Sequence, residues 1–331
     1  MASIVVTGVG GGVGQSIIKC LQKSEYEIIG TDGEVLGTGL YAVKRGYKVP
    51  YASDPGYTDR LLDICRNNRC SLIFPGLDAE LPFLSREVSR FKEIGTTPIV
   101  SSPDVVDICD DKLETYRFLV THGFDAPYTF ALSNEFNPAS TYPLVLKTKR
   151  GGARSRGVYV VRNDREFSRI LPDLNKNNYV GQEFIEGDEY TAGSINFHGI
   201  CHGIIIMKRI LRDGDTYKAF VVKDQRIEEY LGKVAETIKP FGPCNFQFRE
   251  RDGKYYIFDI NARCSGTTYC RALAGFNEPL MTADYLNHGK SPKYRIHEVT
   301  ILRYWKELLL ENLEIKSVED IGYRNGPKIL L

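Results

Sequence analysis

The first hundred residues alternate short apolar runs with longer amphipathic stretches, and this alternation restricts the fold more than any other feature. The expected strands cover 4–7, 26–32, 71–75 and 98–100, and the expected helices between them cover 15–21, 57–67 and 81–91. Strands that alternate with helices favour a parallel sheet covered by helices on both faces. We therefore expect residues 1–107 to form a doubly wound α/β domain.

A glycine-rich turn, residues 8–14, follows the first expected strand. Dinucleotide-binding turns need glycines at i, i+2 and i+5, and the third of these positions is Val13 here, although Asp32 stands near the place of a ribose-binding acid. We favour a tight turn whose amides, at Gly11 and Gly12, face a substrate. A nicotinamide oxidoreductase is the alternative, and it leaves everything after residue 110 unexplained.

Two acids, Asp78 and Glu80, follow the third expected strand. Open α/β sheets bind ligands at the carboxyl ends of their strands, so these acids could hold a substrate amine. They could equally place negative charge in the first turn of the next helix, which the helix dipole favours. Both interpretations stay open at this point.

Two lysines and a glycine loop suggest a site for phosphate. Lys112 begins an expected helix over 112–122, where a cation opposes the helix dipole unless it meets an anion. Lys147 ends an expected strand and precedes a loop, 148–157, that holds three arginines. Flexible glycines and cations are suited to covering a polyphosphate, although a solvated hairpin loop would have the same composition.

Residues 247–263 predict a β-hairpin, because two aromatic-rich runs flank a charged turn. Side chains alternate along a strand, so Asp259 and Asn261 share one face while Phe258 and Ile260 take the other. Oxygen ligands of this kind, together with Gln247 on the first strand, suit Mg²⁺. A solvated outer face of an ordinary hairpin is the alternative.

The register of this hairpin tests the metal interpretation. A two-residue turn at Asp252-Gly253 would place Gln247 opposite Phe258, on the wrong face for Asp259. The metal interpretation therefore predicts an odd-length loop, for example 252–254. Arg263 follows the second strand and suits a phosphate.

Four features stand in an order that resembles the ATP-grasp superfamily. They are Lys112 at a helix start, Lys147 before a glycine loop, residues 182–185 with Glu189 beyond them, and Gln247 followed by residues 259–263. Within that superfamily the chain is similar to single-unit proteins that resemble one half of a carbamoyl-phosphate synthetase large chain. The resemblance covers nearly the whole chain and implies a pre-ATP-grasp domain, a small lobe over 108–182 and a large lobe over 183–331.

The resemblance implies a role for each matching residue. ATP phosphates would be contacted by Lys112 and Lys147 and covered by the loop that holds Gly151, Gly152 and Ser155. The adenosine would be held by Gln182, Glu183, Phe184, Ile185 and, at the ribose, Glu189. Mg²⁺, or Mn²⁺, would be held by Gln247, Asp259 and Asn261. The resemblance also implies catalysis by Arg263 and Asn261. From their positions alone we add Lys208 and Arg209, which flank a hairpin expected over the ATP site, as further catalytic candidates. By the same reasoning the acceptor would meet Ser265, at the exit of the metal strand, and residues of the first domain, which are Gly11, Gly12, Asp78 and Glu80.

Three positions depart from the family pattern. Asp259 stands where the family usually has glutamate, and Thr148 and Ala262 stand where proline is common. None of these changes removes a required charge, so we expect an active enzyme.

The activity that the resemblance implies is an ATP-dependent ligase. It would activate a small carboxylate as an acyl phosphate for attack by an amine or another nucleophile, forming ADP and phosphate. The alternatives are a carboxyphosphate- or carbamate-forming enzyme and an ATP-binding module without turnover.

The composition restricts the classes of partner and the cellular location that we expect. Lys plus Arg is 43 and Asp plus Glu is 42, so no global charge favours nucleic acid or a membrane surface. The eight cysteines show no CxxC pair, and neither a signal peptide nor a membrane-length apolar run is apparent, so we expect a reducing cytoplasm. The tail over 294–331 could complete the core or form a homodimer contact.

Overall fold

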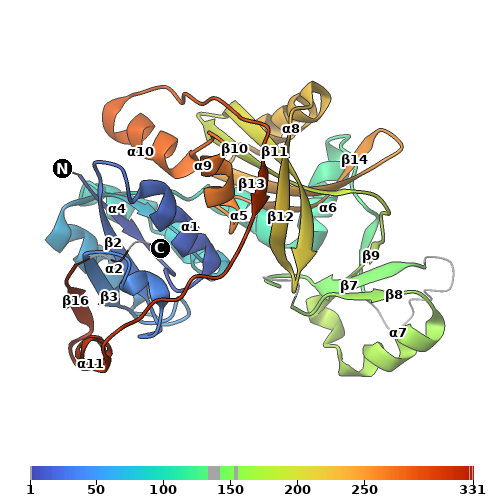
Figure 1. Cartoon of the computed structure of the whole chain (residues 1–331). Helices are drawn as coiled ribbons and strands as arrows, with labels where there is room; N and C mark the ends of the chain where they lie inside the picture. The colour runs from blue at the N-terminus through green and yellow to red at the C-terminus, as the bar shows by residue number, and fades with distance from the viewer. Residues whose placement is uncertain (1, 133–141, 153–155, 328, 330) are drawn as a thin grey trace.

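The structure is a computed structural model that describes residues 2–132, 142–152, 156–327, 329 and 331. Three sheets organise the chain, and Figure 1 shows the first at one end of the molecule, the third at the other end and the second between them. None of the helices in the described ranges is long and apolar enough to cross a membrane.

The first sheet is the predicted parallel sheet, extended by two strands. Its order is β16-β3-β2-β1-β4-β5. The strands are β1 (Ser3–Val6), β2 (Glu27–Asp32), β3 (Arg45–Lys48), β4 (Cys70–Phe74), β5 (Thr97–Pro98) and β16 (Tyr323–Asn325). β1 to β5 run parallel, whereas β16 pairs antiparallel with β3.

Helices cover both faces of the first sheet, so the predicted doubly wound arrangement is confirmed. The helices are α1 (Gly12–Leu21), α2 (Tyr57–Asn68), α3 (Leu81–Arg86), α4 (Val88–Glu93) and α5 (Pro103–Asp110). Ile4 and Val6 pack toward α1, whereas Val5 between them packs toward α2, as alternation along a strand requires. The helix expected over 81–91 is two short helices, α3 and α4, which meet at Glu87.

The second sheet is antiparallel and has the order β14-β13-β10-β11-β12-β15. Its strands are β10 (Glu189–Phe197), β11 (Ile200–Arg212), β12 (Asp215–Val222), β13 (Gly242–Arg251), β14 (Lys254–Asn261) and β15 (Thr300–Leu302). The covering helices are α6 (Lys112–Thr121) and α8 (Gln225–Ile238) on one face and α9 (Thr268–Leu273) and α10 (Glu278–His288) on the other. Ile206 and Met207 show the alternation, since they belong to the cores on opposite faces.

The third sheet is small and has the order β6-β9-β7-β8. Its strands are β6 (Thr129–Ala131), β7 (Leu144–Thr148), β8 (Tyr159–Val161) and β9 (Tyr179–Glu183). α7 (Asp164–Ile170) packs Phe167 against it. Within the described ranges, the remaining short elements are 3-10 turns at Thr38–Leu40, Asp78–Glu80, Leu171–Asp173 and Lys176–Asn178.

The C-terminal tail returns to the first sheet. After β15 the chain crosses the molecule, forms α11 (Asn312–Ile321) and adds β16 to the sheet beside β3 (Figure 1). Val318 on α11 is buried in the core on the α1 side of that sheet. The tail therefore completes a core, and its last strand lies with the first domain although the predicted range 183–331 placed it with the large lobe.

The hairpin of β13 and β14 has the predicted pairing of Gln247 with Asp259, but its turn differs from the predicted one. Its turn has two residues, Asp252 and Gly253, both with positive φ, and not the predicted odd-length loop. Gln247 still pairs with Asp259, because the register shifts between this pair and the pair of Phe248 with Ile257. Phe258 is thus the extra residue of a β-bulge, and it lines the same cavity as Asp259 instead of taking the opposite face.

Candidate active site

A cavity of about 960 Å³ opens between the three sheets. The first domain contributes its glycine turn and the segment after β4, the small lobe contributes β7 and the start of the glycine loop, and the large lobe contributes the hairpin and β11. The predicted residues that line this cavity are Gly11, Gly12, Asp78, Lys112, Lys147, Gly151, Gly152, Gln182, Glu183, Phe184, Ile185, Glu189, Arg209, Gln247, Asp259, Asn261, Arg263 and Ser265. Ser155 lies outside the described residues.

Asp259 is held between two lysines and an amide. Lys112 Nζ lies 2.9 Å from Asp259 Oδ1, and Asn261 Nδ2 donates to Asp259 Oδ2 at 2.7 Å. Burial alone would raise the pKa of Asp259, but Lys112 and Lys147 outweigh it and lower that pKa to about 2. The carboxylate is therefore ionised at any physiological pH.

The β-bulge gives Lys147 its position. Lys147 Nζ donates to the carbonyl of Phe258, the bulged residue, at 2.9 Å. The side chain is buried, and burial lowers its pKa to about 7 although Asp259 opposes that shift. An anion beside this amine would favour its charged form.

Arginines contact the other two predicted metal ligands. Arg209 Nη2 donates to Gln247 Oε1 at 2.8 Å, and Arg263 Nη2 donates to Asn261 Oδ1 at 3.1 Å. With Lys112 on Asp259, each of the three oxygen ligands now faces a cation of the protein. The oxygens of the three side chains are of the kind that a hard divalent metal ion prefers. A metal ion could bind them once Lys112, Arg209 and Arg263 turn toward phosphate.

Arg263 joins the first domain to the hairpin. Its Nε and Nη2 atoms donate to the two oxygens of Asp78, both at 2.6 Å, in a bidentate pair. Asp78 belongs to the 3-10 turn after β4, so the end of the parallel sheet reaches the end of the metal strand. Asp110 also lines this end of the cavity.

The predicted adenosine side holds several fixed contacts. Gln182 donates to Thr129 Oγ1 at 2.8 Å, and the Glu183 N–H donates to the Tyr128 carbonyl at 2.8 Å. Glu189 accepts from Arg209 at 2.6 Å and from Arg249 at 2.7 Å, one arginine on each carboxylate oxygen.

Two predicted site residues lie away from the cavity. Glu80 is fully buried and accepts from Thr7 Oγ1 at 2.6 Å, from two backbone N–H groups of the β4 loop and from the Tyr57 hydroxyl, so it fixes that loop and cannot meet a substrate. Lys208 points to the face of β11 opposite to Arg209 and pairs with Asp188 at 2.5 Å. Strand alternation allowed only one of the neighbouring cations Lys208 and Arg209 to enter the cavity.

Sequence reasoning missed a buried support behind the site. Arg271 on α9 donates to Asn245 Oδ1 at 2.9 Å, to Ser265 Oγ at 2.7 Å and to Glu278 Oε2 at 3.1 Å. Arg271 and Glu278 are both 0% exposed, whereas Asn245 and Ser265 line the cavity. A charged residue within the apolar run of α9 was the only available signal.

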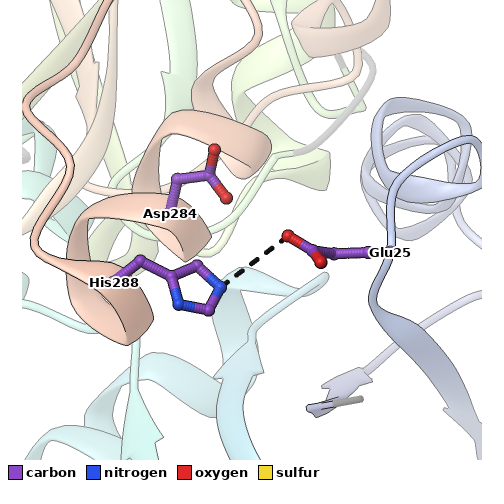
Figure 2. Close-up of side chains that lie close together, drawn as sticks. All are labelled: Glu25, Asp284 and His288. Atoms are coloured by element: carbon purple, nitrogen blue, oxygen red, sulfur yellow. Dashed lines mark ion pairs between the residues drawn. The ribbon is translucent and has the colours of Figure 1, made fainter.

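A second contact joins the first domain to α10, away from the cavity. Figure 2 shows Glu25 facing Asp284 and His288, with His288 Nε2 lying 3.8 Å from Glu25 Oε1. Tyr26 donates to Asp284 Oδ1 at 2.8 Å. Among the described residues these three side chains are the one group of three or more His, Cys, Asp or Glu residues whose ligand atoms all lie within 4.8 Å of one another.

Comparison with known families identifies two parts of the chain. Residues 4–99 match the family described as "PylC-like, N-terminal domain", and residues 176–307 match "ATP-grasp in the biosynthetic pathway with Ter operon". The chain belongs to the ATP-grasp superfamily. The large chain of carbamoyl phosphate synthase from Methanosarcina barkeri is 23% identical over 208 residues, which are 56% of this ATP-grasp protein and 19% of that relative. The chain spans 60%, 19% and 40% of the lengths of the three curated relatives that it matches.

Solved structures share the fold at low identity. N5-carboxyaminoimidazole synthetase from Staphylococcus aureus, complexed with ADP, has a TM-score of 0.71 at 15% identity over 89% of this ATP-grasp protein and 80% of that chain. L-amino acid ligase from Bacillus licheniformis has a TM-score of 0.67 at 14% identity over 87% and 73% of the two chains. These likenesses confirm the predicted ATP-grasp fold.

Proposed function

We propose that this ATP-grasp protein uses ATP to activate a small carboxylate as an acyl phosphate, which an amine then attacks. The observation that carries the proposal is the cavity itself, which is lined by all three sheet-containing parts of the chain. It brings together buried cations, the side-chain oxygens of Gln247, Asp259 and Asn261, and the N-terminus of α1. Phosphoryl transfer depends on positioning and charge neutralisation more than on covalent help from the protein. The cavity supplies both.

ATP would lie between the two lobes. Lys112 and Lys147 would hold its phosphates, Gln182 and the chain up to Ile185 would hold its adenine, and Glu189 would hold its ribose. Phosphate beside Lys147 would replace the interactions that burial removes and would keep this lysine charged.

Gln247, Asp259 and Asn261 would hold Mg²⁺, because their oxygens line one cavity and suit a hard cation. When bound, this ion supplies neutralisation of the charge on the transferring phosphoryl group. Lys112, Arg209 and Arg263 would give up these oxygens and turn to the anionic ligands.

The acceptor carboxylate would meet the start of α1. This helix begins at Gly12 without a side-chain cap, and its first turn lines the cavity, so its unpaired N–H groups can hold an anion. Arg263 would exchange Asp78 for the acyl phosphate. The released carboxylate of Asp78 would then accept hydrogen bonds from the incoming amine.

Transfer of oxygen from the carboxylate to phosphate tests the proposal. The protein is incubated with Mg²⁺-ATP, pooled amines and a panel of ¹⁸O-labelled carboxylates, with bicarbonate included to reveal carboxyphosphate formation. An acyl phosphate attacked at its carbonyl carbon leaves one ¹⁸O in the released phosphate, seen as a mass increase. Phosphate release without ¹⁸O for every carboxylate would contradict the proposal, and Asp259→Asn serves as the control without turnover.

A further inference from the structure

A second cavity, of about 450 Å³, lies beside the glycine turn of the first domain. It sits at the carboxyl ends of β1, β2 and β3, and its walls include the glycine turn, Asp32, Glu34, Leu36, Tyr51 and Leu77. Apart from the residues that it shares with the main cavity, none of the residues that line it takes part in the proposed reaction. It shares Gly10, Gly11 and Leu77 with that cavity.

Leu77 lines both cavities, at their common border with Gly10 and Gly11. Its side chain lies across the glycine turn so closely that a Cβ at Gly8 would come within 2.5 Å of Leu77 Cγ, and Gly8 also has a positive φ. The turn is therefore as thin as a backbone can be at this point. Leu77 is 43% exposed, and it is the side chain that both cavities share.

The charges of the second cavity have one sign. Asp32 and Glu34 line it, and no lysine, arginine or histidine is present among the described residues of its wall. Asp32 is fixed because its oxygens accept from the N–H groups of Gly10 at 2.6 Å and Glu34 at 2.9 Å. An anionic ligand would meet uncompensated negative charge here, whereas an ammonium or guanidinium group would be stabilised.

Apolar side chains stand open at the rim of the second cavity. Leu36 is 73% exposed and Tyr51 is 61% exposed, and the Tyr51 hydroxyl donates to the Glu34 carboxylate. This hydrogen bond holds an aromatic ring beside a carboxylate, an arrangement that favours a cation on an apolar stem. Large exposed apolar residues around one cavity are typical of a ligand site.

We propose that this second cavity binds the cationic end of an elongated acceptor whose carboxylate reaches the ATP site past Leu77. The inference rests on the proposed function for the carboxylate end, and on the charge and shape of the second cavity for the cationic end. It assigns the acceptor to aliphatic molecules that carry an ammonium or guanidinium group several carbons from a carboxylate.

Direct binding tests the cationic end without any turnover. Calorimetry with n-hexylamine is compared for the wild type, Glu34→Gln and the matched control Glu93→Gln, an exposed acid on α4 that does not line the cavity. We expect n-hexylamine to bind and Glu34→Gln to weaken it about five- to tenfold, with Glu93→Gln unchanged. No binding to the wild type, or equal binding to the wild type and Glu34→Gln, would overturn the proposal.

ADP release tests the complete acceptor. We expect 6-aminohexanoate to have a lower KM than hexanoate, and Glu34→Gln to remove this difference while leaving ADP release with hexanoate unchanged. If hexanoate and 6-aminohexanoate are equally good substrates, the proposed function stands and the inference about the second cavity falls. If no carboxylate supports ADP release while n-hexylamine binding depends on Glu34, the cation site stands and the proposed function falls.

Discussion

Asp259 is the residue at which the charges of the cavity meet. It pairs with Lys112, accepts from Asn261 and lies near Lys147, which together hold its pKa at about 2 against the effect of burial. Asp259→Asn keeps the shape and removes the charge. We expect kcat to fall by about a hundredfold or more, since one electrostatic contact to a transition state is commonly worth about 3 kcal/mol.

The fold of this variant should persist, because the hairpin keeps its backbone pairing and its bulge. A steady-state ADP assay and a thermal melt check both expectations. Turnover near the wild-type rate in a correctly folded Asp259→Asn would refute the metal assignment.

Asp78 should act on the incoming amine and not on ATP. Its bidentate pair with Arg263 closes the acceptor end of the cavity, and its proposed second partner is the amine. In Asp78→Asn we expect KM for the amine to rise about tenfold, while ADP formation with the carboxylate alone is retained. A rise in KM for ATP with no change for the amine would speak against this role.

The sequence predicted a cavity-lining residue correctly where the proposed chemistry needs a particular charge or oxygen ligand at that position. Asp259, Asn261 and Lys147 stand near strand ends where a polar or charged group has no packing role, and they line the cavity. Glu80 has the same appearance in the sequence but is fully buried. Its four hydrogen-bond partners come from three separate segments, which no local pattern shows.

At the scale of elements, α9 and α10 hold the acceptor wall through the buried pair of Arg271 and Glu278. Burial raises the pKa of Glu278 to about 7, with Arg271 opposing the shift. The native state thus holds this proton more tightly than the unfolded chain does. The pair contributes most stability below about pH 4.5 and loses it as the pH rises toward 7.

Glu278→Gln removes that titration. Between pH 4.5 and 7.5 the wild type should lose on the order of 3 kcal/mol of unfolding free energy that the variant does not lose. Urea unfolding of both proteins at several pH values measures the difference in slope, from which any constant effect of the substitution on Arg271 cancels. Parallel pH profiles would disprove the titration of Glu278.

Regular apolar elements were predictable, and polar or bent ones were not. β1 and β4 are buried apolar runs, whereas β3 and β16 carry arginine and tyrosine and lack that signal. The bulge at Phe258 also escaped prediction. Alternation gives the faces of a strand but not the point where one extra residue resets them.

At the scale of the whole molecule, the tail adds β16 to the edge of the first sheet beside β3 and so holds the first domain together. Arg324 on β16 donates to the Val43 carbonyl at 2.8 Å, to Glu314 at 2.5 Å and to the Pro327 carbonyl at 2.7 Å. Arg324→Ala should therefore lower the free energy of unfolding by about 3 kcal/mol. It should leave kcat within about twofold, because Arg324 does not line the cavity.

Chemical denaturation and the ADP assay measure these two effects separately. An unchanged unfolding midpoint would show that the tail is not part of the cooperative fold. The sequence left the tail open between core and dimer contact, since its apolar residues fit both roles. A homodimer, a cytoplasmic location and the boundaries at 107 and 182 stay predictions.

The most direct test of the central claim is ADP release from Mg²⁺-ATP with a panel of carboxylates, each alone and with pooled amines. The proposed function predicts release that depends on one class of carboxylate, a new amide by mass spectrometry when the amine is present, and loss of both in Asp259→Asn. ATP binding without release in any mixture, or release that Asp259→Asn leaves intact, would contradict it.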